Sequence, residues 1–383
     1  MMTLNDLETP CLILDRRRLE ANVARMSARA RALGVDLRPH MKTAKSADVA
    51  RLATAGQSGA ITVSTLREAD YFLDHGFRDI TYGVGIAPAK LDRVAALQAR
   101  GGRVRVVTDS AEVARAVSER AAALGQTFEV LIEVDTGDGR AGVAPESEAL
   151  IEIGRILAAA AGTTLAGVLT HAGHSYGCRR IEDIVAVAEA ERAGAVRAAE
   201  RLRGAGLPCP VVSVGSTPTA LHARTLDGVS EMRPGVYMFQ DVFQAAIGSC
   251  AVDDIAISVL ATVTSHHRER GEILIDAGGL ALSKDRSTAE SPRDVGYGLV
   301  VDVKCENFDT ELHVIRVSQE HGIVAAPDGG PVPFESLAPG TRVRVLPNHA
   351  CFTAAAYDRY HVIDGGSPAA DDVIAVWPRV NGW

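Results

Sequence analysis

From Cys11 to about residue 240, short apolar runs alternate with alanine- and arginine-rich stretches of helical period. This alternation predicts repeated strand and helix units around a parallel sheet. About eight repeats favour a TIM-like (β/α)8 barrel over an open sheet, because the glycine fingerprint of a dinucleotide-binding fold is missing after the first apolar run. The expected strands cover residues 11–14, 35–38, 60–63, 79–82, 104–107, 129–134, 165–170, 211–214 and 236–239.

After about residue 250 the pattern changes to valine-, isoleucine- and threonine-rich runs broken by glycine. Such runs predict the strands of a mostly antiparallel module. The expected fold class is therefore α/β, with a barrel over residues 1–250 and a β domain over residues 251–383. A length of 383 residues fits this division, since a barrel of this kind takes about 250 residues.

Composition narrows the class of partner. The net charge is −8, and no lysine- and arginine-rich tract is present, which argues against nucleic acid or an anionic membrane as the main partner. No export segment marks the amino terminus, and the six cysteines are spread singly, as expected of a reduced cytoplasmic protein. A small molecule is the favoured partner.

Lys42 is a candidate nucleophile. It follows the expected strand 35–38, and barrel enzymes place their chemistry at the carboxyl ends of strands. A lysine amine becomes a useful nucleophile, able to form a Schiff base, when it is partly desolvated or lies near another cation, and Arg38 and His40 are close in sequence. The alternative is a solvated surface lysine.

Two segments near the end of the barrel pattern are candidate anion-binding loops. Gly215, Ser216 and Thr217 follow an apolar strand, and their small side chains allow N–H groups and hydroxyls to surround an anion. Gly235 and Tyr237 lie about one barrel unit later, and the last two strand ends of a barrel commonly form a phosphate site. The alternative for the first segment is a tight turn.

His349 and Cys351 are candidate metal ligands. Residues two apart on a strand project from the same face, so both side chains could reach one ion. A thiolate with an imidazole favours zinc over magnesium or manganese. A buried cysteine beside a structural histidine is the competing interpretation.

Further polar residues follow two other strands. His171 and Tyr176 could pack against a ring or exchange protons. Arg140 could bond a phenolate oxygen or a substrate carboxylate, unless it is a solvated loop charge.

Taken together, these segments resemble the fold-type III pyridoxal phosphate enzymes, the alanine racemase-like group. Within it they resemble the branch of D-serine dehydratases, D-threo-3-hydroxyaspartate dehydratases and D-threonine aldolases. The resemblance covers nearly the whole chain and is carried by Thr9-Pro10, Arg38-Pro39-His40-x-Lys42-Thr43-x-Lys45, Val63-Ser64-Thr65-x-x-Glu68-Ala69, Gly215-Ser216-Thr217-Pro218-Thr219, Gly235-Val236-Tyr237, Asp276-Ala277-Gly278, Gln319-Glu320-His321-Gly322 and Pro347-Asn348-His349-x-Cys351.

The resemblance implies a role for each site residue. Lys42 would carry the cofactor, pyridoxal 5'-phosphate, and its phosphate would be held by Gly215, Ser216, Thr217, Gly235 and Tyr237. Arg140 would bond the phenolic oxygen of the cofactor, and His171 and Tyr176 would line its ring. The group is typically homodimeric.

The metal motif distinguishes reactions within the branch. The motif His349-x-Cys351 resembles that of the dehydratases. By the same resemblance, the D-threonine-cleaving members carry His-x-Asp at this position. This implies a lyase that removes water from a D-3-hydroxy amino acid such as D-serine or D-threo-3-hydroxyaspartate and yields a 2-keto acid and ammonia. Lys42 would remove the Cα proton, and a divalent metal, most simply zinc, would assist departure of the hydroxyl.

Three other functions remain open at this point. Retro-aldol cleavage to glycine and an aldehyde could use the same residues. A racemase would have no use for the metal pair, and a non-catalytic pyridoxal phosphate carrier would leave His349 and Cys351 unexplained.

Overall fold

The computed structural model describes residues 2–305, 310–365 and 371–383 and divides into two compact units. We call residues 25–235 with 382–383 the barrel unit, and residues 1–24 with 236–381 the β unit. Helix α1 (Arg16–Leu33) runs from one unit into the other. The sequence placed the division near residue 250, with the amino terminus in the barrel.

The barrel unit is built on an eight-stranded parallel sheet, in the order β2-β9-β8-β7-β6-β5-β4-β3. A parallel bridge between His40 and Thr62 joins the two ends of this order. The strands are short and almost entirely buried, as expected of parallel strands covered by helices. They are β2 (Asp36–Leu37), β3 (Ile61–Val63), β4 (Asp79–Gly85), β5 (Arg103–Thr108), β6 (Phe128–Glu133), β7 (Thr163–Leu169), β8 (Val211–Val214) and β9 (Glu231–Met232).

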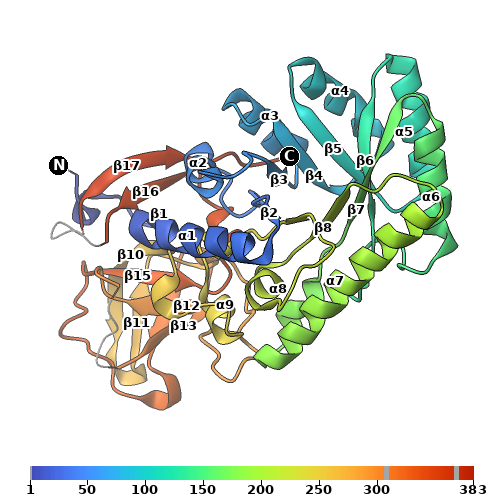
Figure 1. Ribbon diagram of the computed structural model, residues 1–383. Helices are drawn as coiled ribbons and strands as arrows, with labels where there is room; N and C mark the ends of the chain where they lie inside the picture. Colours follow the sequence, from blue (N-terminus) through green and yellow to red (C-terminus); the bar gives the residue numbers. More distant parts are fainter. Residues whose placement is uncertain (1, 306–309, 366–370) are drawn as a thin grey trace. The chain divides into compact units, whose positions relative to one another are not determined.

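Helices flank these strands, with α5, α6 and α7 along the outside of β5 to β8 (Figure 1). Each has a stripe of buried, mostly apolar residues, which includes several alanines in α5 and α7 and larger aliphatic residues in α6. The helical segments are α2 (Ala47–Thr54), α3 (Leu66–Asp74), η2 (Pro88–Lys90), α4 (Leu91–Ala99), α5 (Ala111–Leu124), α6 (Glu148–Ala159), η3 (Gly173–Gly177), α7 (Ile181–Gly204) and α8 (Thr217–His222).

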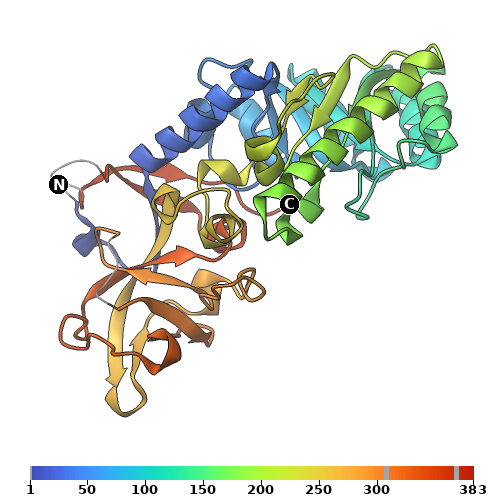
Figure 2. The same cartoon turned by 60° about the horizontal axis from the view of Figure 1, so that its bottom comes forward.

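The β unit contains a nine-stranded sheet in the order β11-β14-β13-β12-β15-β10-β1-β16-β17, with antiparallel neighbours except for β1 and β16. Figure 2 shows most of its strands as yellow to red arrows. An additional pairing of β10 with β11 closes the strands from β11 to β10 into a ring. The strands are β1 (Cys11–Asp15), β10 (Ile257–His267), β11 (Glu272–Ile275), β12 (Gly298–Val301), β13 (Leu312–Val317), β14 (Gly322–Ala325), β15 (Arg342–Pro347), β16 (Arg359–Ile363) and β17 (Val373–Pro378).

Short helices connect the strands of the β unit. They are η1 (Leu4–Asp6), η4 (Val236–Met238), α9 (Val242–Ala246), η5 (Val252–Asp254), η6 (Arg268–Arg270), α10 (Gly279–Leu282), η7 (Pro327–Gly329) and α11 (Ala350–Ala354). None of the helices in the described ranges is both long and apolar enough to cross a membrane.

The predicted fold class, a TIM-like barrel with a mostly antiparallel β domain, is confirmed, but two of the expected barrel strands are wrong. Residues 11–14 form β1, which pairs with β10 and β16 in the β unit. Residues 236–239 begin with the 3-10 turn η4, in which Val236 O accepts from the N–H groups of Phe239 and Gln240. Both segments are fully apolar runs, and such runs do not reveal their partners from sequence alone.

Candidate active site

The segment that carries Lys42 follows β2 and is tied to neighbouring segments by main-chain hydrogen bonds. His40 N–H donates to Pro234 O at 2.9 Å, and Met41 N–H donates to Thr62 O at 2.8 Å. Lys42 is exposed, and its N–H lies 3.4 Å from His40 Nδ1. The backbone around Lys42 is thus held in place while its amine stays accessible, as a nucleophilic lysine requires.

Two buried carboxylates anchor this segment at either side of Lys42. Arg38 is buried and pairs with Glu231 Oε2 at 2.8 Å, so its charge is neutralised within the sheet. Lys45 has a left-handed backbone (φ +47°), and its Nζ lies 3.0 Å from Oε1 of Glu68. A non-glycine residue in this conformation costs about 1–3 kcal/mol, which the pairing with the buried Glu68 offsets.

His171 lies at the end of β7, beside the loop after β8. Its Nδ1 is 2.7 Å from Gly215 O. A carbonyl oxygen only accepts, so Nδ1 carries the proton and Nε2 is left as an acceptor. The ring of Tyr176 follows in η3, with its centroid 6.4 Å from that of His171.

Positive charge dominates around these histidines. Burial and the charges of Lys42, Arg140 and Arg233 lower the pKa of His171 to about 3. Burial and the same charges also lower the pKa of His40 well below its usual range. Two neutral imidazoles beside cationic side chains suit an anionic ligand, because cations attract an anion while neutral rings can pack against it.

Arg140 is exposed and only loosely engaged. Its guanidinium lies 3.6 Å from Glu133 Oε1 and 3.9 Å from Asp138 Oδ2. An exposed guanidinium with a fork of N–H donors can also bind a carboxylate or a phenolate of a ligand. The ligand-binding role of Arg140 stays a prediction.

The loop after β8 needs glycine at its first position. Gly215 has φ +136°, and a Cβ there would lie 2.7 Å from Arg233 N. Its N–H donates to Glu191 at 2.9 Å, and Ser216 N–H donates to Thr219 Oγ1 at 3.1 Å. Gly215 therefore lets this loop pass close to the backbone of Arg233, and its own N–H group is bonded to Glu191 inside the protein.

Glu191 fastens two strand-end loops to helix α7. Its Oε1 accepts from Ala172 N–H at 3.0 Å and from Gly215 N–H at 2.9 Å. Ala172 adjoins His171, and Gly215 begins the predicted phosphate loop. One buried carboxylate therefore sets the positions of two predicted cofactor-binding segments.

We expect Glu191→Ala to lower the free energy of unfolding by about 3 kcal/mol, because two buried N–H groups lose their acceptor and each costs about 1–3 kcal/mol. Urea unfolding measures this change. Glu189→Ala is the matched control, since Glu189 on the same helix pairs with Arg192 at the surface and such pairs contribute about 0–1 kcal/mol. Equal losses in the two variants would contradict the role of Glu191.

We also expect His171 to shape the pH dependence of stability. Because its pKa is about 3 in the folded chain against 6.5 for an ordinary histidine, the unfolded chain binds more protons between these values. Stability therefore falls as the pH is lowered from about 6.5. In urea unfolding at pH 6.5 and pH 5, His171→Gln should lose less stability than the unmodified chain; an unchanged slope would contradict the assignment.

Gly235 and Tyr237 lie on either side of the division between the units. A Cβ on Gly235 would meet His40 O at 2.8 Å, so glycine permits the close approach of its segment to the Lys42 segment. Tyr237 is fully buried in the β unit, and burial raises the pKa of its hydroxyl. The hydroxyl is accordingly protonated and able to donate.

His349 and Cys351 come together by a different geometry from the one expected. Strand β15 ends at Pro347, and His349 is the N-cap of α11, which begins at Ala350. Cys351 lies in the first turn of that helix. The prediction that both project from one face of a strand is therefore wrong, although the two side chains do interact with each other.

The approach to this pair is rigid. Asn348 is buried, and its Nδ2 donates to Gly296 O at 2.6 Å and to Thr288 Oγ1 at 3.1 Å. Its Oδ1 accepts from Thr288 N–H at 3.2 Å. These bonds fix the backbone immediately before His349.

The donor set fits a metal ion held by two protein ligands. Burial opposes the charge of His349, but the nearby carboxylate of Asp285, together with Cys351 and Asp241, raises the pKa of His349 to about 11. A metal ion would replace this proton, and a thiolate with an imidazole suits zinc. In the described part of the chain, no group of three or more His, Cys, Asp or Glu side chains is placed to hold a metal, so water or substrate would complete the coordination.

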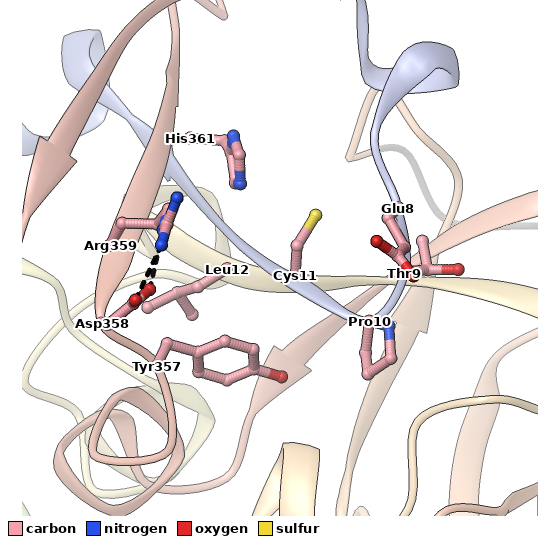
Figure 3. Close-up of a pocket in the computed structure, with 9 residues that line it drawn as sticks. All are labelled: Glu8, Thr9, Pro10, Cys11, Leu12, Tyr357, Asp358, Arg359 and His361. Atoms are coloured by element: carbon pink, nitrogen blue, oxygen red, sulfur yellow. Dashed lines mark hydrogen bonds and ion pairs between the residues drawn. The ribbon is translucent and has the colours of Figure 1, made fainter.

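A cavity of about 510 Å³ lies elsewhere in the β unit (Figure 3). It is lined by Glu8, Thr9, Pro10, Cys11, Leu12, Tyr357, Asp358, Arg359 and His361. Burial raises the pKa of the Cys11 thiol to about 12, and Arg359 pairs with Asp358. The cavity contains none of the predicted site residues, and its thiol stays protonated and unreactive.

Comparison with family models identifies the family to which the chain belongs. The family model "Alanine racemase, N-terminal domain" matches residues 14–242, and "Putative serine dehydratase domain" matches residues 256–363. The chain belongs to the alanine racemase-like, fold-type III pyridoxal phosphate family. The family predicted from the sequence motifs is thereby confirmed.

Members of this family resemble the chain over their full length. D-threo-3-hydroxyaspartate dehydratase of Delftia sp. (strain HT23) is 47% identical, with 100% of this chain and 99% of that protein covered. D-serine dehydratase of Dictyostelium discoideum is 33% identical, with 94% of each covered. A 3-hydroxy-D-aspartate aldolase of Paracoccus denitrificans (strain Pd 1222) is 30% identical, with 98% and 92% covered.

Solved structures give the same result. The structure of the Delftia dehydratase superposes with a TM-score of 0.96 at 45% identity and covers 100% of both chains. A cysteine-to-alanine mutant of that enzyme, described as the metal-free form, has the same TM-score, identity and coverage. The matching proteins thus include dehydratases and an aldolase. One of the matching dehydratase structures is described as a metal-free form.

The sequence motifs missed three carboxylates near the candidate ligands: Glu191, Asp241 and Asp285. Glu191 could have been found from the sequence, because it falls on the otherwise apolar stripe of α7. Asp241 could also have been found, since it is a charged residue within the largely apolar run from Val236 to Phe243.

Proposed function

We propose that the chain is a pyridoxal phosphate- and metal-dependent lyase that removes water from a D-3-hydroxy amino acid and releases a 2-keto acid and ammonia. The observation that carries this proposal is the imidazole and thiolate pair of His349 and Cys351 in a chain that resembles a dehydratase over its full length. A racemase or a non-catalytic cofactor carrier would need no metal, so either function would leave His349 and Cys351 unexplained.

The site residues have separate tasks. When bound, pyridoxal phosphate supplies an electron sink for the charge left at Cα, and a divalent metal supplies Lewis acidity. Lys42 holds the cofactor and takes the Cα proton at its Nζ. His349 and Cys351 hold the metal, for which we propose zinc.

Further residues hold and orient the cofactor. Ser216 and Thr217, with Gly235 and Tyr237, surround its phosphate, and Gly215 leaves the room for it. His171 and Tyr176 line the ring, and the guanidinium of Arg140 bonds its phenolic oxygen. The neutral His171 ring presents Nε2 as an acceptor because Nδ1 is bonded to Gly215 O.

We propose D-threo-3-hydroxyaspartate as the preferred substrate and D-serine as the second. This order follows the relatives, among which a D-threo-3-hydroxyaspartate dehydratase is 47% identical and a D-serine dehydratase is 33% identical to the chain. The D configuration is taken from the relatives.

Retro-aldol cleavage is the second candidate function, favoured by the full-length similarity to a 3-hydroxy-D-aspartate aldolase. It would break Cα–Cβ and produce glycine and an aldehyde. The cysteine at position 351 favours dehydration, because the resemblance gives the D-threonine-cleaving members aspartate at this position.

Two further expectations belong to this proposal. The protein acts as a homodimer, and it works in the cytoplasm. Sedimentation of the purified protein and cell fractionation test them in turn.

Metal removal tests the proposed function. We expect a chelator to abolish ammonia release from D-threo-3-hydroxyaspartate and D-serine while the cofactor stays bound, because the hydroxyl then lacks its Lewis acid. Added Zn²⁺ should restore the activity at lower concentration than Mg²⁺ or Mn²⁺, since thiolate ligands prefer zinc. Full activity of the metal-free protein would overturn the metal-dependent function.

A further inference from the structure

A buried carboxylate contacts the backbone between the two predicted metal ligands. Asp241 is 1% exposed and caps helix α9. Its Oδ1 accepts from Gln244 N–H at 2.8 Å, and its Oδ2 accepts from Ala350 N–H at 2.9 Å. Asp241 therefore holds the residue that separates His349 from Cys351.

A second carboxylate faces the imidazole. Asp285 Oδ2 lies 3.4 Å from His349 Nδ1. Asp285 Oδ1 is itself held by Ser287, whose N–H donates to it at 2.9 Å. This is an ion-pair distance and not a formed hydrogen bond. With a carboxylate beside Nδ1, Nε2 is the nitrogen left for a metal, and metal-binding histidines commonly have a carboxylate next to their other ring nitrogen.

Both side-chain oxygens of Asp241 are used to hold backbone. Among the described residues, Asp241 accepts from two backbone N–H groups and forms no ion pair with an arginine or lysine. One of the two N–H groups belongs to Ala350, between the two predicted metal ligands. Asp241 therefore acts on the metal site through the backbone that presents both ligands.

We propose that Asp241 and Asp285 are positioning residues for the metal site. Asp241 fixes the backbone that presents both ligands, and Asp285 orients the His349 ring so that Nε2 faces the metal. This inference rests on the metal-dependent function proposed above.

The test measures metal affinity directly. Metal-free protein with its cofactor bound is titrated with Co²⁺ against a chromophoric chelator, and the thiolate-to-cobalt absorption reports ligation by Cys351. Asp241→Asn and Asp285→Asn keep the side-chain size but remove the charge. Each should bind Co²⁺ about 10–100-fold more weakly than the unmodified protein, the usual loss when a residue that orients a metal ligand is changed.

Asp15→Asn is the matched control. Asp15 is also a buried aspartate of the β unit, 4% exposed, and accepts a backbone N–H from Arg18 at 3.1 Å. It should leave the Co²⁺ affinity unchanged. Urea unfolding of the metal-free proteins separates lost metal affinity from lost stability, and the less buried Asp285 decides the result if Asp241→Asn does not fold.

The outcomes are distinct. Wild-type affinity in Asp285→Asn and in any folded Asp241→Asn protein would overturn the inference and leave the proposed function intact. An unmodified protein that binds neither Co²⁺ nor Zn²⁺ would overturn the metal-dependent function and this inference together.

Discussion

Lys42→Ala should produce a protein that neither retains the visible absorbance of its cofactor nor turns over substrate. The side chain supplies both the amine that holds pyridoxal phosphate and the base that takes the Cα proton. Loss of a positioned acid or base alone costs about 10²–10⁴-fold in rate, so the combined loss should exceed this range. Absorbance after dialysis and ammonia release at saturating D-threo-3-hydroxyaspartate measure the two effects.

Lys90→Ala is the matched control for this prediction. Lys90 lies in the same unit, and its Nζ is 3.1 Å from the Tyr82 hydroxyl. Its loss should leave both the absorbance and the turnover close to those of the unmodified protein. A Lys42→Ala protein that keeps its cofactor absorbance through dialysis would show that another residue carries the cofactor.

Cys351→Ala should separate cofactor binding from catalysis. The residues that are proposed to hold the cofactor are unchanged, so the absorbance should persist. Removal of the thiolate takes away one of two protein ligands, and the turnover should fall by at least about 10²-fold as the metal is lost. Metal content by atomic absorption, cofactor absorbance and ammonia release are measured on one preparation.

Cys305→Ala controls for the loss of a thiol in the same unit. Cys305 is partly buried and packs against an apolar cluster of the β unit. The Cys305→Ala protein should retain its bound metal and its turnover rate. Metal bound at the wild-type level in Cys351→Ala would contradict the assignment of Cys351 as a ligand.

The barrel was predictable because its helices and strands repeat with a clear period. The expected strands 104–107, 129–134 and 165–170, for example, correspond to β5, β6 and β7. The position of Lys42 after a strand was predictable for the same reason, since β2 ends at Leu37. Local periodicity therefore indicates where a strand-end residue lies.

Pairing partners were not predictable in the same way. The run 11–14 is apolar on both faces, and its partners β10 and β16 are far away in the sequence. His349 and Cys351 follow a strand, but the chain turns into a helix after Pro347. Their spacing indicated proximity correctly and the local geometry wrongly.

The carboxylates around the site divide into two kinds. Glu191 and Asp241 interrupt apolar patterns, so a charged residue at a buried position could have marked both as functional candidates. Asp285 lies in a polar loop segment, and only the folded chain shows that it faces His349. Long-range contacts of this kind leave no trace in local sequence.

The most direct test of the account is the identity of the products from the purified, metal-supplemented protein. D-threo-3-hydroxyaspartate, D-serine and D-threonine are incubated separately, and ammonia, 2-keto acid, glycine and aldehyde are quantified. Equal amounts of ammonia and 2-keto acid, fastest from D-threo-3-hydroxyaspartate, are the predicted result. Glycine and an aldehyde in equal amounts, without ammonia, would contradict it and identify the protein as an aldolase.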